Sequence, residues 1–263
     1  TKSKFDSQEM KWDSPFGKGY PGWHLECSAM ASKYLGEQFD IHCGGMDLAP
    51  IHHTNEIAQS EGAFGKKWVN YWLHSEFLVL KKGEKMSKSS GDFLTLSVLG
   101  EKGFDPLVYR YFCLGTSYRN PLMYSEDALV SSGNALRKLY DKILEIKGTS
   151  GKVSKKHLKS FTDAVSDDLN TPKGLAVMWE VLGSNLKDAD KYATLLEFDS
   201  VLGLGLKSLK KEKIPTEVVK LAKERLAARN SKEWAKSDKL REKIRGLGWD
   251  IGDTKDGYDL RKA

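Results

Sequence analysis

The sequence of 263 residues has few cysteines and lacks a long apolar run. Its three cysteines, Cys27, Cys43 and Cys113, are an odd number without the spacing of a disulfide framework, which indicates a reducing compartment. No apolar stretch is long enough to cross a bilayer, and residues 1–12 lack the apolar core of a signal peptide. We therefore expect a cytoplasmic protein with no membrane partner.

The charge is only slightly unbalanced. The net charge of +6 permits a polyanionic partner such as nucleic acid but does not require one. The length of 263 residues exceeds what one hydrophobic core usually serves, so we expect about two or three domains. The chain begins with Thr1, and its first residues have the composition of a surface segment, so we expect it to be part of something longer.

Side chains that can bind metals or transfer protons gather in residues 23–74. Five of the six histidines lie there together with Cys27, Glu26 and Glu56; the histidines are His24, His42, His52, His53 and His74. A random scatter over the chain would seldom produce this grouping.

Part of this group has the pattern of a metal site. The residues after Pro50 have the composition of a helix start, and on a helix His52 and Glu56 lie on one face because they are four residues apart. With the thiolate of Cys27 brought in by the fold, they form a three-ligand set that suits zinc and leaves one position open. The alternative is that Cys27 is a small core residue and the histidines are polar groups at a helix start.

A nucleotide crevice is indicated just before this helix. Residues 26–35 have apolar positions at helical spacing, and a strand-like FDIHC leads into Gly44 and Gly45 and then Asp47. In open α/β sheets, a strand followed by glycines and an acid presents backbone groups and a carboxylate for a ribose hydroxyl. This string alone is weak evidence for a nucleotide site, because many loops have the same composition.

A basic loop follows the next apolar segment. Residues 68–80 predict one or two buried strands separated by a turn, and residues 81–93 are rich in lysine, glycine and serine. Lys85 and Lys88 could neutralise a triphosphate while neighbouring serines donate hydrogen bonds. Composition alone favours the alternative, which is a solvated basic loop.

The second half of the chain is predicted to be mainly helical. A buried helix is expected over 105–118, and Ser125 and Asn170 have the position of helix caps before apolar stripes. With the segments around Phe161 and Leu195, these helices predict a bundle of about four. Such stripes are normally core, so we assign them no chemistry.

A small unit is predicted after a charged linker at 207–215. It has two helices, 216–229 and 231–246, and a hairpin with its turn near 255–257. Trp234 lies among lysines and arginines, as in a platform that stacks the bases of single-stranded RNA. The alternative is that Trp234 belongs to the core of the unit.

Three strings that occur in order point to a family. They are PGWHLECSAM, HCGGMDLAPIHHTNEIAQS and the KMSKS of residues 85–89. The chain resembles the cysteinyl-tRNA synthetases, which are class I aminoacyl-tRNA synthetases. The resemblance implies an α/β fold: part of a Rossmann-type nucleotide-binding domain at 1–116, a tRNA-binding helical bundle at 117–206, and a linker with a small α/β anticodon-binding domain at 207–263.

The resemblance also implies a zinc ion. The family binds zinc through two cysteines, a histidine and a glutamate, and Cys27, His52 and Glu56 match three of these ligands. The first cysteine has no counterpart in this chain. The zinc binds the ionised thiol of substrate cysteine, and it rejects serine because a hydroxyl has a much higher pKa, so no editing site is needed.

The implied reaction joins cysteine to its tRNA. The cysteine carboxylate attacks the α-phosphate of ATP, bound with Mg²⁺, and the cysteinyl group then passes to the terminal ribose of tRNA(Cys). We expect a monomer. The resemblance assigns catalysis to Lys85, Lys88 and His42, and substrate binding to Trp23, His24, His53 and His74. It assigns ATP binding to Gly45, Asp47 and Lys88. It assigns anticodon binding to Arg229, Trp234, Asp238 and Asp253.

The chain also departs from the family. No H-x-G-H string, the other signature of class I synthetases, occurs in it, so we expect little or no amino-acid activation by this chain alone. Tyr20, Cys43 and Asp92 replace an arginine, a glycine and an asparagine. Two alternatives stay open. A ligase that joins cysteine to a glucosaminyl-inositol sugar would not need residues 216–263, and a non-catalytic RNA-binding fragment would not need the zinc ligands.

Overall fold

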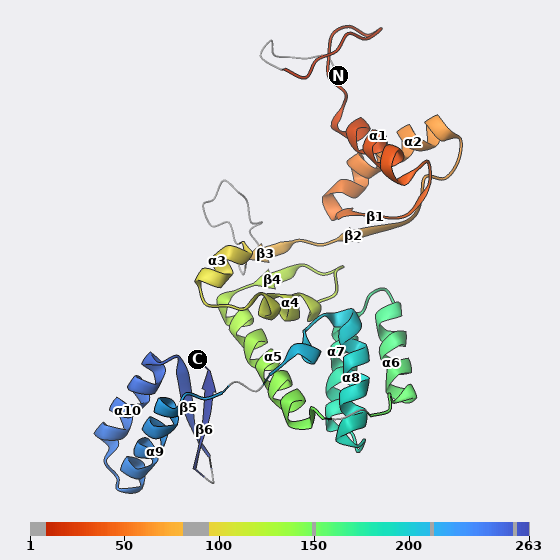
Figure 1. Ribbon diagram of the computed structural model, residues 1–263. Coiled ribbons are helices and arrows are strands. Elements are labelled where there is room, and N and C mark those ends of the chain that lie inside the picture. The colour runs from red at the N-terminus through yellow and green to blue at the C-terminus, as the bar shows by residue number, and fades with distance from the viewer. Residues whose placement is uncertain (1–8, 81–94, 149–150, 211–212, 255–256, 263) are drawn as a thin grey trace. The chain divides into compact units, whose positions relative to one another are not determined.

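The computed structural model describes residues 9–80, 95–148, 151–210, 213–254 and 257–262 (Figure 1). The chain divides into two compact units, Thr1–Ser208 and Leu209–Ala263. No described helix is both long and apolar enough to span a membrane. The predicted domain bounds at residues 116 and 206 stay predictions.

The first unit opens with a helix, α1 (Trp23–Leu35), followed by a β-α-β arrangement. The arrangement consists of β1 (Phe39–Gly45), α2 (Thr54–Phe64) and β2 (Val69–Ser75), and β1 pairs with β2 in parallel. Parallel strands need a crossover, and α2 provides it. A 3-10 turn (Met46–Leu48) and a π-helical turn (Ala49–His53) lead from β1 into α2, so the helix expected after Pro50 becomes regular only at Thr54.

The two faces of the β1–β2 pair differ in their cover. Figure 1 shows α1 and α2 together on one side of these strands. Alternation along β1 directs His42 to α2, where it bonds to Glu56. On the other face Ile41 and Tyr71, which are partners in the register, are 58% and 67% exposed. Parallel sheets are normally covered on both faces. Within the described ranges, this second face is therefore open.

A second parallel pair belongs to a separate sheet. β3 (Leu78–Leu80) pairs with β4 (Leu122–Tyr124), and α3 (Leu96–Glu101) and α4 (Pro106–Leu114) pack on it. The shared core is Leu99, Phe112, Tyr124 and Leu129. The segment 68–80 thus contains two strands, in agreement with the prediction of one or two strands there. The helix expected over 105–118 ends earlier, at Leu114.

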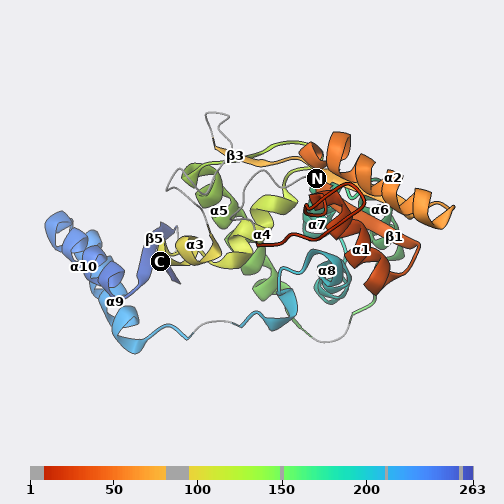
Figure 2. The same ribbon diagram turned by 90° about the horizontal axis from the view of Figure 1, so that it is seen from above.

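Four helices form the predicted bundle. They are α5 (Glu126–Ile146), α6 (Lys155–Ser166), α7 (Thr171–Gly183) and α8 (Asp188–Leu202), followed by a 3-10 turn, η4 (Leu206–Ser208). The expected caps are confirmed: Ser125 accepts from the Ala128 amide and Asn170 from the Lys173 amide. The rings of Phe161 and Phe198 stack inside at 4.1 Å between centroids. Figure 2 shows this unit from above.

The second unit has its own core. It contains α9 (Thr216–Asn230), α10 (Trp234–Gly246) and an antiparallel hairpin of β5 (Trp249–Thr254) and β6 (Gly257–Lys262). Its core is Val218, Ala222, Ile244, Trp249 and Ile251. The predicted antiparallel strand pair is confirmed, and residues 255–256 of its expected turn lie outside the described residues. The second helix begins at Trp234 and not at 231, because Lys232 takes a left-handed conformation with φ of 60°.

Candidate metal and substrate site

The site is centred on the buried carboxylate of Glu56 in α2. This side chain is 0% exposed, and each oxygen faces a different histidine. Oε2 lies 2.7 Å from Nε2 of His42 in a hydrogen bond, and Oε1 lies 2.6 Å from Nε2 of His52. Oε1 nevertheless has no hydrogen-bond partner among the described residues, because the second contact lacks hydrogen-bond geometry. A cation bound at this oxygen would offset the cost of burying it.

Cys27 completes a ligand set that includes this carboxylate. One ligand atom each from Cys27, His52 and Glu56 lie within 4.8 Å of one another, and the residues come from α1, the π-helical turn and α2. Burial, followed by the negative charge of Glu56, raises the pKa of the Cys27 thiol. A bound cation would favour the thiolate instead. The donor types and the unpartnered buried oxygen both fit a zinc ion.

A second group shares the same carboxylate. His42, His53 and Glu56 also place one ligand atom each within 4.8 Å of one another. Sequence reasoning did not identify this group, since His42 is distant from the helix along the chain. The sequence did contain a signal for it: in a strand, alternate side chains lie on one face, so His42 and the space above Gly44 are on the same face of β1.

The remaining histidines form a chain of contacts with the same centre. Nδ1 of His24 lies 2.7 Å from Nδ1 of His52, and Nδ1 of His53 lies 2.8 Å from Nε2 of His74. Burial, then the neighbouring His42 and His74, lowers the pKa of His53 to about 4. This imidazole is therefore neutral at physiological pH.

Two tryptophans hold the rings in place. The indole of Trp23 stacks on His52 with centroids 4.0 Å apart, and Trp72 stacks on His42 at 4.7 Å. Trp23 was expected at the site, whereas Trp72 was not. The structure thus brings Cys27, His42, His52 and His53 to Glu56, and His24 and His74 join this group through contacts with His52 and His53.

The expected nucleotide residues lie at the carboxyl end of β1. Gly45 is the last residue of that strand, and Oδ1 of Asp47 is 2.6 Å from the point that a Cβ on Gly45 would occupy. The Asp47 side chain therefore folds over the backbone of Gly45, and a larger residue at position 45 would require it to move. Cys43 is exposed and alternates to the face opposite His42, so its thiol does not join the histidines.

Among the expected RNA-binding residues of the second unit, Arg229 contacts both Trp234 and Asp253. Trp234 is 56% exposed, so the alternative that it is a core residue is wrong, and the guanidinium of Arg229 lies 5.6 Å from its ring centroid. Asp253 accepts from Nη1 and Nη2 of Arg225 at 2.7 and 3.3 Å. Asp238 is exposed on α10.

Three arginines share this one aspartate. Nε of Arg229 is 3.2 Å and Nη2 of Arg241 is 4.0 Å from Asp253, in addition to the buried Arg225. The hydrogen bonds of Arg225, and then the three positive charges, lower the pKa of the Asp253 carboxyl. Sequence reasoning missed Arg225 and Arg241. The spacing of Arg225 and Arg229, four residues apart on α9, was a signal for the first.

Comparison with known families decides the class. Residues 2–134, half of the 263-residue chain, match the catalytic domain of class I (C) tRNA synthetases. The chain belongs to the class I (C) tRNA synthetase family. A second match, to the DALR domain, covers residues 160–207, from α6 through η4. The family assignment agrees with the expected fold of a partial nucleotide-binding domain followed by helices.

Curated synthetases resemble the chain over nearly its whole length. It is 46% identical over 255 residues to cysteine–tRNA ligase 1 of Burkholderia lata, and 42% identical to the cysteine–tRNA ligases of Treponema denticola and Opitutus terrae. These alignments cover 96%, 94% and 99% of this chain. The chain spans only 54% to 57% of the length of these relatives.

A solved synthetase shares the fold. The leucyl enzyme of Agrobacterium radiobacter K84, whose structure is a ternary complex of LeuRS, tRNA and LeuAMS, aligns with a TM-score of 0.53 over 74% of this chain and 32% of its own. The sequence identity is 14%, so this likeness concerns the fold alone.

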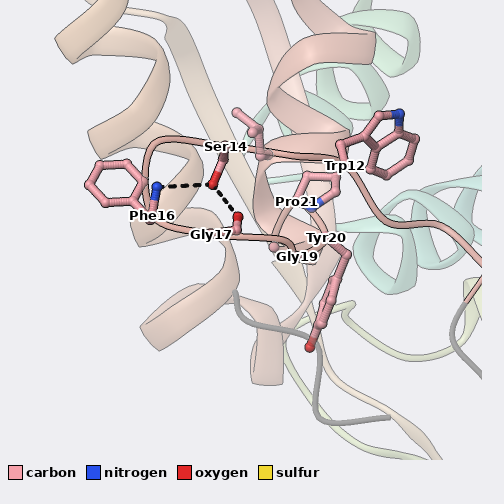
Figure 3. A pocket seen from close by; sticks show the side chains of 9 residues that line it. Trp12, Ser14, Phe16, Gly17, Gly19, Tyr20 and Pro21 are labelled. Atoms are coloured by element: carbon pink, nitrogen blue, oxygen red, sulfur yellow. Dashed lines mark hydrogen bonds between the residues drawn. The ribbon is translucent and has the colours of Figure 1, made fainter. Parts of the chain in front are cut away.

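Two further features of the sequence and the structure complete the description. Lys85 and Lys88, with the rest of the KMSKS string, fall outside the described residues. A pocket of about 630 Å³ lies on the segment before α1, between Trp12 and Leu25 (Figure 3). There Ser14 Oγ donates to the Gly17 carbonyl and accepts from the Phe16 amide, and Tyr20 forms part of the lining.

Proposed function

We propose that this chain carries the zinc site and the RNA-reading unit of a cysteine–tRNA ligase. The observation that carries the proposal is the close grouping of Cys27, His52 and Glu56, together with a buried oxygen of Glu56 that has no hydrogen-bond partner among the described residues. The cysteine–tRNA ligases that match along nearly the whole chain support the same function.

Three protein ligands would hold the zinc and leave a position for the substrate. Zinc supplies selection at that position, because it binds the thiolate of cysteine far better than the hydroxyl of serine. Cys27, His52 and Glu56 fix where the substrate sulfur lies. Trp23, His24, His53 and His74 surround the same centre and would exclude water from the substrate. Neutral His53 adds no charge that would repel the ammonium group of cysteine.

Activation of cysteine is the first step of the proposed reaction. A carboxylate oxygen of cysteine attacks the α-phosphorus of ATP, and the bond from that phosphorus to the bridging oxygen of pyrophosphate breaks. Cysteinyl-adenylate and pyrophosphate result. The protein contributes mainly positioning and charge stabilisation. Lys88, with Lys85, would stabilise the departing pyrophosphate with Mg²⁺, Gly45 and Asp47 would lie beside the nucleoside, and His42 would support the site through Glu56.

Transfer to RNA is the second step. A ribose hydroxyl at the end of tRNA(Cys) attacks the cysteinyl carbonyl, and AMP leaves. We propose that the second unit selects this RNA. Exposed Trp234 offers a face for base stacking, Arg229 beside it contributes charge, and Asp238 and Asp253 are acceptors for amino groups on base edges.

Exchange of pyrophosphate into ATP tests the proposal. The assay uses the 263-residue chain with zinc, with cysteine as substrate and serine as the control. Because no H-x-G-H string is present, we expect little exchange by the chain alone. Addition of the part of a related ligase that contains this motif is expected to restore exchange with cysteine and not with serine.

Two results would change the assignment. Cysteine-specific exchange by the chain alone would mean that it completes an ATP site without that motif. No exchange after the addition, combined with retained tRNA binding, would favour a non-catalytic RNA-binding fragment.

A further inference from the structure

The two buried zinc-ligand candidates each contact a histidine from another element. Glu56 bonds through Oε2 to Nε2 of His42 on β1, and His52 contacts Nδ1 of His24 on α1 through its own Nδ1. These contacts use one carboxylate oxygen, Oε2 of Glu56, and one ring nitrogen, Nδ1 of His52. The other two atoms, Oε1 of Glu56 and Nε2 of His52, lie 2.6 Å apart and are left for a metal.

We propose that His24 and His42 are positioning residues that orient the zinc ligands His52 and Glu56. The proposal rests on the zinc site of the proposed function. A ligand side chain has rotational freedom that must be removed before it binds metal, and a hydrogen bond to its distal atom removes it. Neither histidine touches the metal in this arrangement.

The hydrogen-bond directions follow from the metal position. With Nε2 of His52 on the metal, the proton of this ring lies on Nδ1 and is donated to Nδ1 of His24. His24 then carries its own proton on Nε2. On the other side, Nε2–H of His42 donates to Oε2 of Glu56, which leaves Oε1 to the metal. Each ligand is thereby held in one protonation state and one orientation.

Ring stacking reinforces both contacts. Trp23 stacks on His52 and Trp72 stacks on His42, with centroid separations of 4.0 and 4.7 Å. Since Trp72 and His42 are register partners on adjacent strands, the sheet itself sets the position of the His42 ring.

The competing role for His42 is that of a ligand. His42, His53 and Glu56 lie close enough to hold a second ion. Geometry favours positioning, because the His42 contact satisfies the criteria of a hydrogen bond and the His52 contact with the same carboxylate does not. The two roles differ in the number of zinc ions bound.

Zinc binding by the 263-residue chain tests the inference. Affinity is measured by competition with a chromophoric chelator, and stoichiometry by titration. We expect one equivalent of zinc, and about 10- to 100-fold weaker binding after His42→Ala or His24→Ala. His42→Gln places an amide donor near the former Nε2, and His24→Asn places an acceptor oxygen near the former Nδ1. Both are expected to recover most of the affinity.

Cobalt(II) supplies a readout of ligand identity. The sulfur-to-cobalt charge-transfer band is expected to persist in His42→Ala, with shifted d–d bands, and to vanish in Cys27→Ser. His157→Ala is the matched control, because this histidine lies on α6 and bonds to Ser154. Thermal unfolding of each metal-free variant shows whether it folds.

The outcomes separate the two proposals. If the unaltered chain binds no zinc, or binds it equally well after Cys27→Ser, the proposed zinc site fails and the inference fails with it. If zinc binds through Cys27 but the alanine variants of His24 and His42 bind as tightly, the inference alone is overturned. Two equivalents that fall to one in His42→Ala would also overturn it, since His42 would then be a ligand.

Discussion

At the scale of single residues, Gly44 is the closest-packed position of the site. A Cβ there would lie 2.5 Å from Cε1 of His53 and 2.9 Å from Cδ1 of Leu48. His53 cannot move aside without breaking its contact with His74. We expect Gly44→Ala to cost about 1–3 kcal/mol of unfolding free energy through overpacking, measured by urea denaturation.

Gly62 is the matched control for this substitution. It lies in α2, next to the site in sequence, but nothing lies within 4 Å of its Cβ position. Gly62→Ala should stabilise the chain by about 0.5–1 kcal/mol, because alanine loses less backbone entropy in a helix. Equal effects of the two substitutions would contradict the close packing of His53 on Gly44.

The carboxyl of Asp253 predicts a dependence of stability on pH. The arginines around it lower its folded pKa below the ordinary value of 3.8. The contribution of this carboxylate to the unfolding free energy is therefore complete above that ordinary value and is lost as the pH falls through the folded pKa. We expect the difference in urea midpoint between the unaltered chain and Asp253→Asn to be constant from pH 7 to about 5 and to shrink below 3.8. A difference that stays constant to pH 2 would show that the pairing does not stabilise the fold.

Sequence reasoning named the proposed ligands, which the structure brings close together, but not the side chains that support them. Cys27, His52 and Glu56 followed from residue types and helical spacing, which are local properties. Trp72 and Arg225 were not identified, because their contacts depend on the register of β1 with β2 and on the return of the hairpin to α9. Such contacts join residues that the spacing along the chain does not relate.

At the scale of elements, the helix caps can be tested individually. Asn170 accepts from the Lys173 amide at 3.1 Å and begins α7, whereas Lys187 precedes α8 without a side-chain capping bond. We expect Asn170→Ala to lower the unfolding free energy by about 1 kcal/mol, because an amide at the start of α7 loses its acceptor. Lys187→Ala should leave the urea midpoint of the chain nearly unchanged. A loss of similar size in both variants would mean that the cap contributes nothing specific.

Element boundaries were predictable where a side chain marks them. Ser125 and Asn170 mark the starts of α5 and α7, because each side chain accepts a hydrogen bond from a backbone amide of the first turn. Two helix starts were misplaced for reasons outside that chemistry: α10 starts late because Lys232 is left-handed, and α2 starts after a π-helical turn that carries His52 and His53. π-helical turns are frequent at functional sites, and here the turn sets both imidazoles beside the carboxylate of Glu56.

At the scale of the whole molecule, metal binding and RNA binding are assigned to different units. Among the described residues, one hydrophobic cluster, Leu99 and its neighbours, lies in the first unit, and another, Val218 and its neighbours, lies in the second. We therefore expect thermal unfolding of the chain to show two transitions. Deletion of residues 209–263 should remove one of them and leave zinc affinity unchanged while tRNA binding weakens.

The variant Arg225→Met separates folding of the second unit from RNA contact. Arg225 is 1% exposed and donates hydrogen bonds to Asp253 from the buried side. Its replacement should therefore lower the unfolding free energy of the second unit by about 2 kcal/mol and lower the temperature of that transition only. Trp234→Ala, at an exposed position, should weaken tRNA binding without moving either transition. If Arg225→Met shifted both transitions together, the two units would unfold as one, and the zinc site could not be studied independently of the RNA-binding unit.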